Sequence, residues 1–289
     1  MMFSVIVPTH NRISSLKQTL ESLFHQDYDD YEIIVVNDGS TDDTDEYLSR
    51  LASQGRISYL PQSNRGPAVA RNLGLEHARG GYIAYTDDDC VVPTNWLRRL
   101  SETFDRTGAD IVGGKVINCV LGNIFSEVSQ EISSYWVQFC NREGGGSAVL
   151  TSNNIGYRSE AIKKAGGFNE RFRYPGFEER ALNFRILRSG GTSAYDNDLT
   201  VQHFHAMTAS NFFRQQFYYG RGAYLYYRVL GKELGSAPSP LPLAAYISLV
   251  NQFLRGNILK GLTKTMIFVL AQVIGMLGLV TQTGTASRS

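Results

Sequence analysis

The sequence predicts an α/β fold in which a mostly parallel sheet carries helices on both faces. Short apolar runs rich in β-branched residues alternate with amphipathic stretches of helical period through the first 115 residues. Polar clusters follow three of these runs, at 9–12, 37–40 and 87–89. Because ligands bind beyond the carboxyl ends of the strands in such sheets, we expect the three clusters to contribute to one site.

Four strands and three helices are expected to alternate in the first part of the chain. The runs at 3–7, 31–36, 57–60 and 81–86 are short and apolar, which is typical of buried parallel strands. Leu16, Leu20 and Leu23 recur on one face of the first predicted helix. The pattern places the three helices at 14–24, 41–51 and 68–77.

The second part of the chain is less regular. After Pro93 a helix containing Trp96 and Phe104 is expected. The elements that follow are predicted as a strand at 110–116, helices at 159–166 and 178–189, and a strand at 200–204. Residues 117–150 show no clear pattern, except that three glycines at 144–146 predict a mobile loop.

From residue 210 the composition changes, and aromatic and basic side chains alternate as far as residue 228. An amphipathic helix packed on the rest of the protein and a surface for a lipid-linked ligand both fit this stretch. Three prolines then predict a linker at 237–242, followed by helices at 243–260 and 262–282.

Residues 266–280 are apolar except for Gln272. This stretch is shorter than the roughly 20 residues needed to span a bilayer. Arg255, Lys260 and Lys264 precede it, as expected of a flank on the cytoplasmic side of a membrane. Two interpretations stay open: an embedded or interfacial membrane anchor, and a helix that docks on the protein or on a second copy.

Composition excludes some function classes. The formal net charge is +1, which gives no basis for nucleic-acid binding. Three cysteines, Cys90, Cys119 and Cys140, are odd in number, lack metal-site spacing and fit a reducing compartment. The N-terminus enters a strand at once, without the pattern of a secretory signal, so we expect a cytoplasmic protein.

Three consecutive aspartates, Asp87, Asp88 and Asp89, close the fourth apolar run. Alternate side chains of a strand share a face, so Asp87 and Asp89 are expected to project together. Carboxylates gathered at one point repel each other unless a cation lies between them, and oxygen ligands suit Mg²⁺ or Mn²⁺. The alternative is a solvated acidic turn.

Asp38 and Arg71 each allow two interpretations. Asp38 ends the second strand, where it can belong to a turn and helix cap or accept the N–H of a pyrimidine ring. Arg71 lies on the helix that follows Gly66, and it is either a surface arginine or a cation that neutralises phosphate charge near a metal.

Two further pairs of residues are candidates for chemistry. Glu178 and Glu179 open a helix, where acidic residues are favoured by the macrodipole, but adjacent carboxylates can also raise one pKa toward that of a general base. His203 and His205 share a face of an extended segment. They are either a structural pair or, with His203 beside the oxygen ligands, part of a metal site; the cysteines or third histidine of a zinc site are missing.

Taken in order, these motifs resemble family 2 of the inverting, nucleotide-sugar-dependent glycosyltransferases with the GT-A fold. The turn at 8–12 contains no glycine, so it matches neither a dinucleotide fingerprint nor a phosphate-binding P-loop. The similarity covers about residues 3–230 and lies in the segments 4–12, 36–42, 64–66, 70–74, 87–89, 152–154, 166–170 and 178–179. It implies a Rossmann-like α/β/α sandwich with a mostly parallel central sheet and a C-terminal helical extension.

The resemblance implies a role for each matching residue. A nucleotide sugar, with UDP favoured, would be bound by Pro8, Thr9, Asn11, Arg12, Asp38, Gly66, Arg71, Asp87 and Asp88. Mn²⁺ or Mg²⁺ would be bound by Asp89, Asp87 and His203. The acceptor would meet Asn153, Asn154 and Phe177. Glu179 would be the base; the family usually has aspartate there, and Glu178 competes for the role.

The implied reaction moves a single sugar, with inversion, to a hydroxyl of a saccharide or lipid-linked acceptor in the synthesis of a cell-envelope glycan. The Q-x-x-R-W signature of processive synthases is absent. The alternative is a catalytically inactive relative that binds sugar nucleotides or glycans, and a nucleotidyltransferase is disfavoured by the glycine-free first turn. We expect a catalytic domain at 1–209, with a nucleotide-binding half at 1–115 and an acceptor-binding half at 116–209. A membrane-associating extension at 210–289 would hold the protein at the cytoplasmic face of a membrane.

Overall fold

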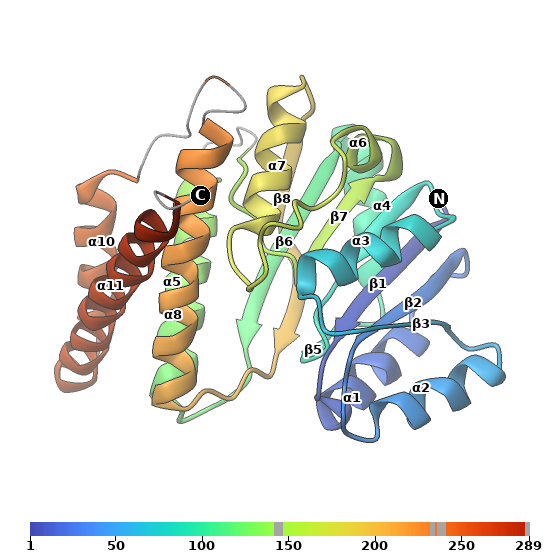
Figure 1. The fold of residues 1–289 in the computed structure, drawn as a ribbon, viewed down its shortest axis with the longest axis horizontal. Coiled ribbons are helices and arrows are strands. Elements are labelled where there is room, and N and C mark those ends of the chain that lie inside the picture. The colour runs from blue at the N-terminus through green and yellow to red at the C-terminus, as the bar shows by residue number, and fades with distance from the viewer. Residues whose placement is uncertain (142–146, 232–234, 236–240, 287–289) are drawn as a thin grey trace.

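The computed structural model describes residues 1–141, 147–231, 235 and 241–286. The predicted glycine loop at 144–146 and residues 237–240 of the predicted linker lie outside these ranges. An eight-stranded sheet forms the centre of the molecule, in the order β3-β2-β1-β4-β7-β6-β8-β5 (Figure 1). Four of its seven strand pairings are parallel, which confirms the predicted fold class.

The first half of the chain folds as the sequence predicts. Its elements are β1 (Phe3–Thr9), α1 (Ile13–Phe24), β2 (Tyr31–Asp38), α2 (Thr44–Ser53), β3 (Ser58–Gln62), α3 (Pro67–His77) and β4 (Tyr82–Tyr85). The helix α2 begins three residues later than expected, because Asp42 accepts hydrogen bonds from the backbone N–H and hydroxyl of Thr44 and so holds the preceding turn. All pairings among these four strands are parallel.

The second half departs further from expectation. Its elements are β5 (Cys90–Val91), α4 (Trp96–Thr107), β6 (Ile111–Asn118), α5 (Ile124–Cys140), β7 (Ile155–Arg158), α6 (Ser159–Lys164), α7 (Glu178–Arg188) and β8 (Ser193–His203). The helix α5 fills the region without a clear pattern, and its N-terminus is capped by the Asn123 side chain, which accepts from the N–H groups of Phe125 and Ser126. The strand β7 runs antiparallel to β4 and β6.

The apolar core lies on both faces of the sheet. Along β1, Val5 and Val7 face one layer, which contains leucines of α1, α2 and α4. Ile6 faces the opposite layer, where α3, α6 and α7 pack. The result is an α/β/α sandwich, and it places the carboxyl ends of β1, β2 and β4 at one edge of the sheet.

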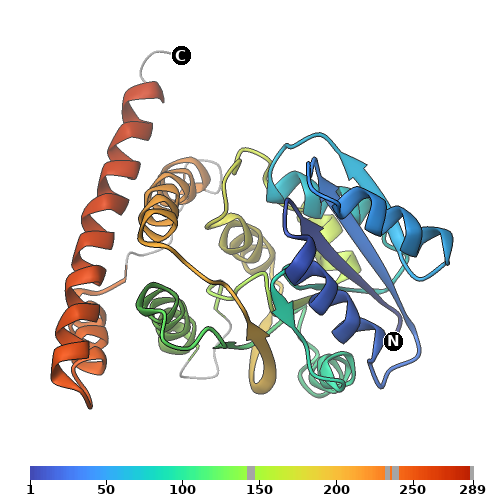
Figure 2. The same ribbon diagram turned by 90° about the horizontal axis from the view of Figure 1, so that it is seen from below.

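The last part of the chain is helical: α8 (Ala209–Tyr224) continues into a π-helical turn, η1 (Leu225–Leu230), and α10 (Leu243–Phe253) and α11 (Ile258–Ala286) follow. Figure 2 shows α11 running beside α8. Their backbones approach closely, since a Cβ at Gly220 would lie 1.8 Å from the carbonyl oxygen of Gly275. The chain breaks at Gly256 (φ +90°) rather than at residue 261, because Asn257 caps α11 through the N–H of Lys260.

One helix among the described residues, Ile258–Thr281, is long and apolar enough to cross a membrane by length and composition alone, with a mean hydropathy of 1.8. The helical segment is longer than the apolar stretch seen in the sequence, because it takes in Lys260 and Lys264, which form ion pairs with Glu127 on α5. Only 22% of its apolar window is buried.

Candidate functional site

A cavity of about 860 Å³ begins at the carboxyl ends of β1, β2 and β4 and extends as far as α11. Fourteen of the sixteen predicted site residues line it: Pro8, Thr9, Arg12, Asp38, Gly66, Arg71, Asp87, Asp88, Asp89, Asn153, Phe177, Glu178, Glu179 and His203. The two exceptions are Asn11 and Asn154. The topology thus brings segments from across the chain to one place, as expected for this class of sheet.

The loop after β3 is held by Asp38, which is buried at the end of β2. Its carboxylate accepts hydrogen bonds from the Gln62 side chain (2.7 Å) and from the backbone N–H groups of Arg65 (2.7 Å) and Gly66 (2.9 Å). Gly66 has φ +94°, and a Cβ there would lie 2.6 Å from the carbonyl oxygen of Arg173. Asp38 therefore positions this wall of the cavity, and one oxygen keeps a free lone pair for a ligand.

The turn after β1 is tied to the turn after β2. Asn11, in the left-handed region at φ +53°, accepts a hydrogen bond from the Thr41 backbone N–H (2.7 Å), and its own N–H donates to the Ser40 hydroxyl (2.9 Å). Its exposed side chain is thus bound to the neighbouring turn, and it does not line the cavity. Asn and Asp tolerate this backbone region better than other non-glycine residues, which explains the residue type.

Asp88 and Asp89 are buried, and both form an ion pair with Arg12. One guanidinium nitrogen of Arg12 lies 3.0 Å from Asp88 and 2.7 Å from Asp89, while the Thr9 hydroxyl donates to Asp88 (2.7 Å). Burial, opposed by Arg12, raises the pKa of Asp88 to about 6. Burial acts in the same direction on Asp89, but hydrogen bonds from His203 and His205 outweigh it and leave the pKa of Asp89 well below its ordinary range.

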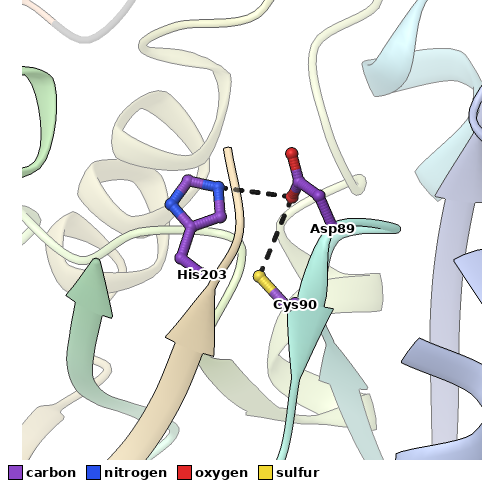
Figure 3. A group of neighbouring side chains, drawn as sticks. All are labelled: Asp89, Cys90 and His203. Carbon is purple, nitrogen blue, oxygen red and sulfur yellow. Dashed lines mark hydrogen bonds and ion pairs between the residues drawn. The ribbon is translucent and has the colours of Figure 1, made fainter. Parts of the chain in front are cut away.

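Two histidines of the strand end flank Asp89. Nε2 of His203 lies 3.2 Å from one carboxylate oxygen, and Nδ1 of His205 lies 2.8 Å from the other. Cys90 completes a group with Asp89 and His203 whose ligand atoms all lie within 4.8 Å of one another (Figure 3). The position of Cys90 beside Asp89 and His203 was not predicted from the sequence. It results from the pairing of β5 with β8, which places Cys90 opposite His203.

The donor set fits a divalent cation. Carboxylate oxygens and imidazole nitrogens are the ligands that Mn²⁺ accepts, and Arg12 already places positive charge between Asp88 and Asp89. Burial raises the pKa of the Cys90 thiol well above its ordinary value, so the neutral thiol is a poor ligand for a hard cation. Asp89 and the two histidines are therefore the residues best placed to hold the ion.

Arg71 connects the aspartates to the glutamate pair. Its guanidinium donates to Asp87 (3.0 Å), to Glu178 (2.9 Å) and to the hydroxyl of Ser152 (2.9 Å). The side chain is almost completely buried, so this ion pair lies in a low dielectric where the charges interact strongly. The surface interpretation of Arg71 is therefore wrong, since the residue is the central cation of the cavity floor.

The two glutamates lie in different surroundings. Glu178 pairs with Arg71 and also accepts the backbone N–H of Gly176 (2.6 Å). Glu179 is also buried and lines the cavity, but among the described residues no other residue donates a hydrogen bond to its carboxylate. Burial, and next the charge of Glu178, raise the pKa of Glu179 to about 8. Glu179 thus combines access to the cavity with a pKa suited to accepting a proton near neutral pH.

The loop before α7 is strained and tightly packed. Phe177 has φ +72°, which is unfavourable for a bulky side chain, and it directly precedes the glutamate pair. Gly176 has φ +120°, and a Cβ there would lie 2.3 Å from the ring of Tyr219. The Tyr174 ring stacks on Tyr218 of α8 with centroids 4.0 Å apart. These contacts fix the loop between α8 and the cavity.

We expect Gly176→Ala to lower activity by displacing this loop, because the added methyl group would meet Tyr219. Gly190→Ala is the matched control, since Gly190 also has positive φ (+87°) but nothing within 4 Å of its Cβ position. Both variants should lose roughly 1–2 kcal/mol of stability from backbone strain. Denaturation and steady-state kinetics would separate them; equal kcat/KM values in the two variants would contradict a positioning role for the loop.

The two asparagines of the 152–154 segment differ. Asn153 lines the cavity, and its side-chain oxygen is buried with no partner found among the described residues. Asn154 is fully buried: its amide donates to the carbonyls of Lys115 and Leu199, and its oxygen accepts the Trp96 indole N–H (2.9 Å). Because Asn154 has no free polar group, it holds β6, β8 and α4 together, and it cannot contact a ligand in this arrangement.

Comparison with known proteins agrees with this geometry. The family model described as "Glycosyl transferase family 2" matches residues 4–166. An uncharacterised glycosyltransferase of Rickettsia felis is 35% identical over 141 residues, which is 44% of this chain and 23% of that protein. The glycosyltransferase GlyG of Streptococcus pneumoniae is 36% identical over 119 residues, 40% of each chain. The chain thus spans less than half the length of these curated relatives.

Solved structures share the fold. A mannosyltransferase from Pyrobaculum calidifontis, in complex with GDP-Man and Mn²⁺, has a TM-score of 0.61 at 19% identity, over 99% of this chain and 79% of that one. S. aureus TarS 1–349, in complex with UDP-GlcNAc, has a TM-score of 0.57 at 16% identity, over 100% of this chain and 92% of that one. At these identities the likeness shows the GT-A fold.

Proposed function

The chain belongs to glycosyl transferase family 2, and on this premise we propose that it transfers a single sugar from a nucleotide-diphosphate sugar to an acceptor hydroxyl. The observation that carries the proposal is the cavity in which Asp89 and its histidines lie together with Glu179. A cation site and a buried base are the two groups that this displacement needs. An inactive relative would not need to keep the raised pKa of Glu179.

The residues on the donor side of the cavity would have separate roles. Asp89, His203 and His205, with Asp87 nearby, would hold Mn²⁺ or Mg²⁺, which when bound neutralises the charge that develops on the leaving diphosphate. Asp38, Thr9 and Gly66 line the part of the cavity at the ends of β1 and β2, where the nucleoside belongs. Arg12 would leave Asp88 and Asp89 when the ion arrives and turn its guanidinium toward the phosphates.

On the acceptor side, Glu179 takes the proton of the attacking hydroxyl. The hydroxyl oxygen forms a bond to the anomeric carbon while the bond from that carbon to the diphosphate oxygen breaks, so one displacement inverts the centre. Glu178 and Arg71 hold α7 against the cavity floor and keep a charge beside the base. Asn153 and Phe177 line the same cavity as Glu179, so they would contact the acceptor sugar.

The proposal is tested by supplying UDP, GDP and dTDP sugars with Mn²⁺ and a membrane lipid extract as the source of acceptors. The expected result is release of one nucleoside diphosphate, dependent on the extract and on the metal, and absent in Glu179→Gln. UDP is favoured as the nucleotide. Binding of nucleotides without release from any donor would support the non-catalytic alternative.

We also propose that α10 and α11 contact the cytoplasmic face of a membrane. Large apolar side chains cover the outer face of α11, and their exposed fractions reach 76% at Leu259 and 63% at Met276. An apolar helix that is packed on one side alone needs a second apolar environment. Arg255 and Lys260 are exposed at the N-terminal end of this surface, where anionic headgroups would meet them, whereas Lys264 pairs with Glu127 and Glu131 of α5.

Flotation with vesicles of an anionic phospholipid measures this contact. Changing Leu262, Met266 and Val273 to serine should reduce the bound fraction several-fold, because all three side chains are at least half exposed on α11. Leu121→Ser is the control, since Leu121 is 90% exposed but lies outside α10 and α11. A membrane-bound fraction that the triple change leaves intact would favour docking on a second copy or on another protein.

A further inference from the structure

The cavity has a polar end and an apolar end, and the proposed donor accounts for the polar end alone. Asp38, the three aspartates and Arg71 form the polar end. The far end lies between α5, α8, α10 and α11, with Gln272 of α11 as a polar exception in a lining that is largely apolar. The apolar residues are Trp136, Leu241, Tyr246, Ala271, Met276 and Leu279. A nucleotide sugar is polar along its whole length, so it does not need these walls.

The apolar end opens toward the outer face of α11. Met276 and Leu279 line the cavity and are nevertheless 63% and 37% exposed. Their neighbours Val273, Leu277 and Val280 are exposed as well, so the mouth of the cavity continues into the apolar surface of the helix. A hydrocarbon chain that leaves the cavity here passes onto an apolar surface without crossing a polar one.

Arg180 lies between the two ends of the cavity. It follows Glu179 directly and lines the cavity, and its guanidinium carbon lies 4.8 Å from the centroid of the Phe177 ring. Burial raises the pKa values of Tyr227 and Tyr246, and the positive charge of Arg180 partly opposes this effect. Arg180 therefore lies near Tyr246 of α10. Arg12 and Arg71 are neutralised by carboxylates, whereas no ion pair within 4.0 Å joins Arg180 to any described residue.

We propose that the acceptor is a sugar joined through a phosphate to a long hydrocarbon chain, with the phosphate at Arg180 and the chain between α8, α10 and α11. This deepens the proposed function and rests on it. A guanidinium presents a planar fork of N–H donors that matches phosphate oxygens. Because Arg180 is adjacent to Glu179, an acceptor anchored by its phosphate presents a nearby sugar hydroxyl to the base. The phosphate itself takes no part in bond making or breaking.

Binding can be measured without the sugar. The probe is a C20 prenyl phosphate in detergent, followed by the fluorescence of Trp136, which lines the apolar end; Trp96, the other tryptophan, is buried beside Asn154. The C20 prenyl alcohol and inorganic phosphate serve as ligands that carry only one of the two features. We expect the prenyl phosphate to bind at least roughly tenfold more tightly than either, which corresponds to one strong charge-assisted contact.

Arg180→Gln should reduce prenyl phosphate affinity to that of the alcohol, while Arg188→Gln, at the exposed end of the same helix, should not change it. Met276→Glu at the mouth should weaken binding of both prenyl ligands. UDP binding should survive in all three variants. Wild-type protein that binds prenyl phosphate but not UDP would contradict the proposed function, and it would leave the assignment of Arg180 standing. Equal affinities for phosphate and alcohol, or an unchanged affinity in Arg180→Gln, would overturn the assignment of Arg180.

Discussion

Glu179→Gln should lower kcat by roughly 10²- to 10⁴-fold, the range expected when a general base is removed. Glutamine keeps the shape and the burial of the side chain but cannot accept the proton of the acceptor hydroxyl. Since Asp89 and Asp38 lie elsewhere in the cavity, donor affinity should change little. The measurement is steady-state kinetics together with nucleotide titration on the same preparation.

The pH dependence follows from the raised pKa. Burial and the charge of Glu178 favour the protonated form, with a pKa of about 8. The base must be ionised to act, so kcat/KM should rise with pH and level off above about pH 8. In Glu179→Gln the residual rate should lose this rise. A profile that is flat from pH 6 to 9 in the wild type would contradict the assignment.

The stability of the protein should fall with rising pH, whereas kcat/KM rises. Between its ordinary pKa of 4.5 and the folded value of about 8, Glu179 binds more protons in the folded state than in the unfolded state. The free energy of unfolding therefore falls as pH rises through this window. Glu179→Gln removes the effect and should be more stable than the wild type at pH 9, by roughly 2–4 kcal/mol, with little difference at pH 4.

Glu178→Gln is the control that separates the two glutamates. Glu178 is held by Arg71 and by the N–H of Gly176, so its loss leaves Arg71 with an uncompensated buried charge toward α7. We expect this variant to be destabilised, while its activity still rises with pH. The rise should move to lower pH, because the charge of Glu178 no longer raises the pKa of Glu179. If Glu178→Gln, and not Glu179→Gln, abolished the pH-dependent step, then Glu178 would be the base.

Most of the first half could be predicted from sequence because β1, β2 and β4 are short apolar runs whose residues are mostly buried, whereas β3 is a partly exposed edge strand. In β1, Val5, Ile6 and Val7 are all fully buried, so local pattern and tertiary environment agree. The strand β8 was predicted too short because Asp196 and Asp198 interrupt its pattern. Those carboxylates are satisfied by Arg99 on α4, a contact that local sequence does not reveal.

Parts of the candidate site could not be predicted from the local sequence. The histidine pair was visible as a spacing, but the approach of His205 to Asp89 depends on the course of the chain beyond β8. Asn154 resembled a ligand-binding residue by motif, yet its three hydrogen bonds are all internal. Contacts between residues far apart in the sequence decide such cases, and a single sequence contains little information about them.

The α11 interpretation shows how packing adds to composition. The sequence left open an anchor or a docked helix, and the structure gives the helix one packed face and one exposed face. Gly275 meets Gly220 of α8, while Val273 and Leu277 point away from the protein and are at least half exposed. The docked description therefore holds for one face of the helix, and the proposed membrane contact would use the other face.

The second large effect is expected at the cation site: Asp89→Ala should weaken Mn²⁺-dependent binding of the donor nucleotide by about 100-fold or more. Asp89 contacts Arg12, His203 and His205 at once, so its removal takes away the one carboxylate on which the other three groups converge. Calorimetric titration of UDP, GDP and dTDP, with and without Mn²⁺, measures this and identifies the preferred base. Asp105→Ala, on the exposed face of α4, is the matched control.

The metal-free titrations are the informative ones for mechanism. Without an ion, Arg12 stays between Asp88 and Asp89, and the phosphates of a nucleotide would meet two buried carboxylates. Wild-type protein in EDTA should therefore bind nucleotide as weakly as Asp89→Ala does with Mn²⁺, and adding Mn²⁺ should rescue the wild type alone. Equal UDP affinity in all four conditions would show that neither the ion nor Asp89 holds the diphosphate, and it would leave Arg12 and Arg71 as the phosphate-binding residues.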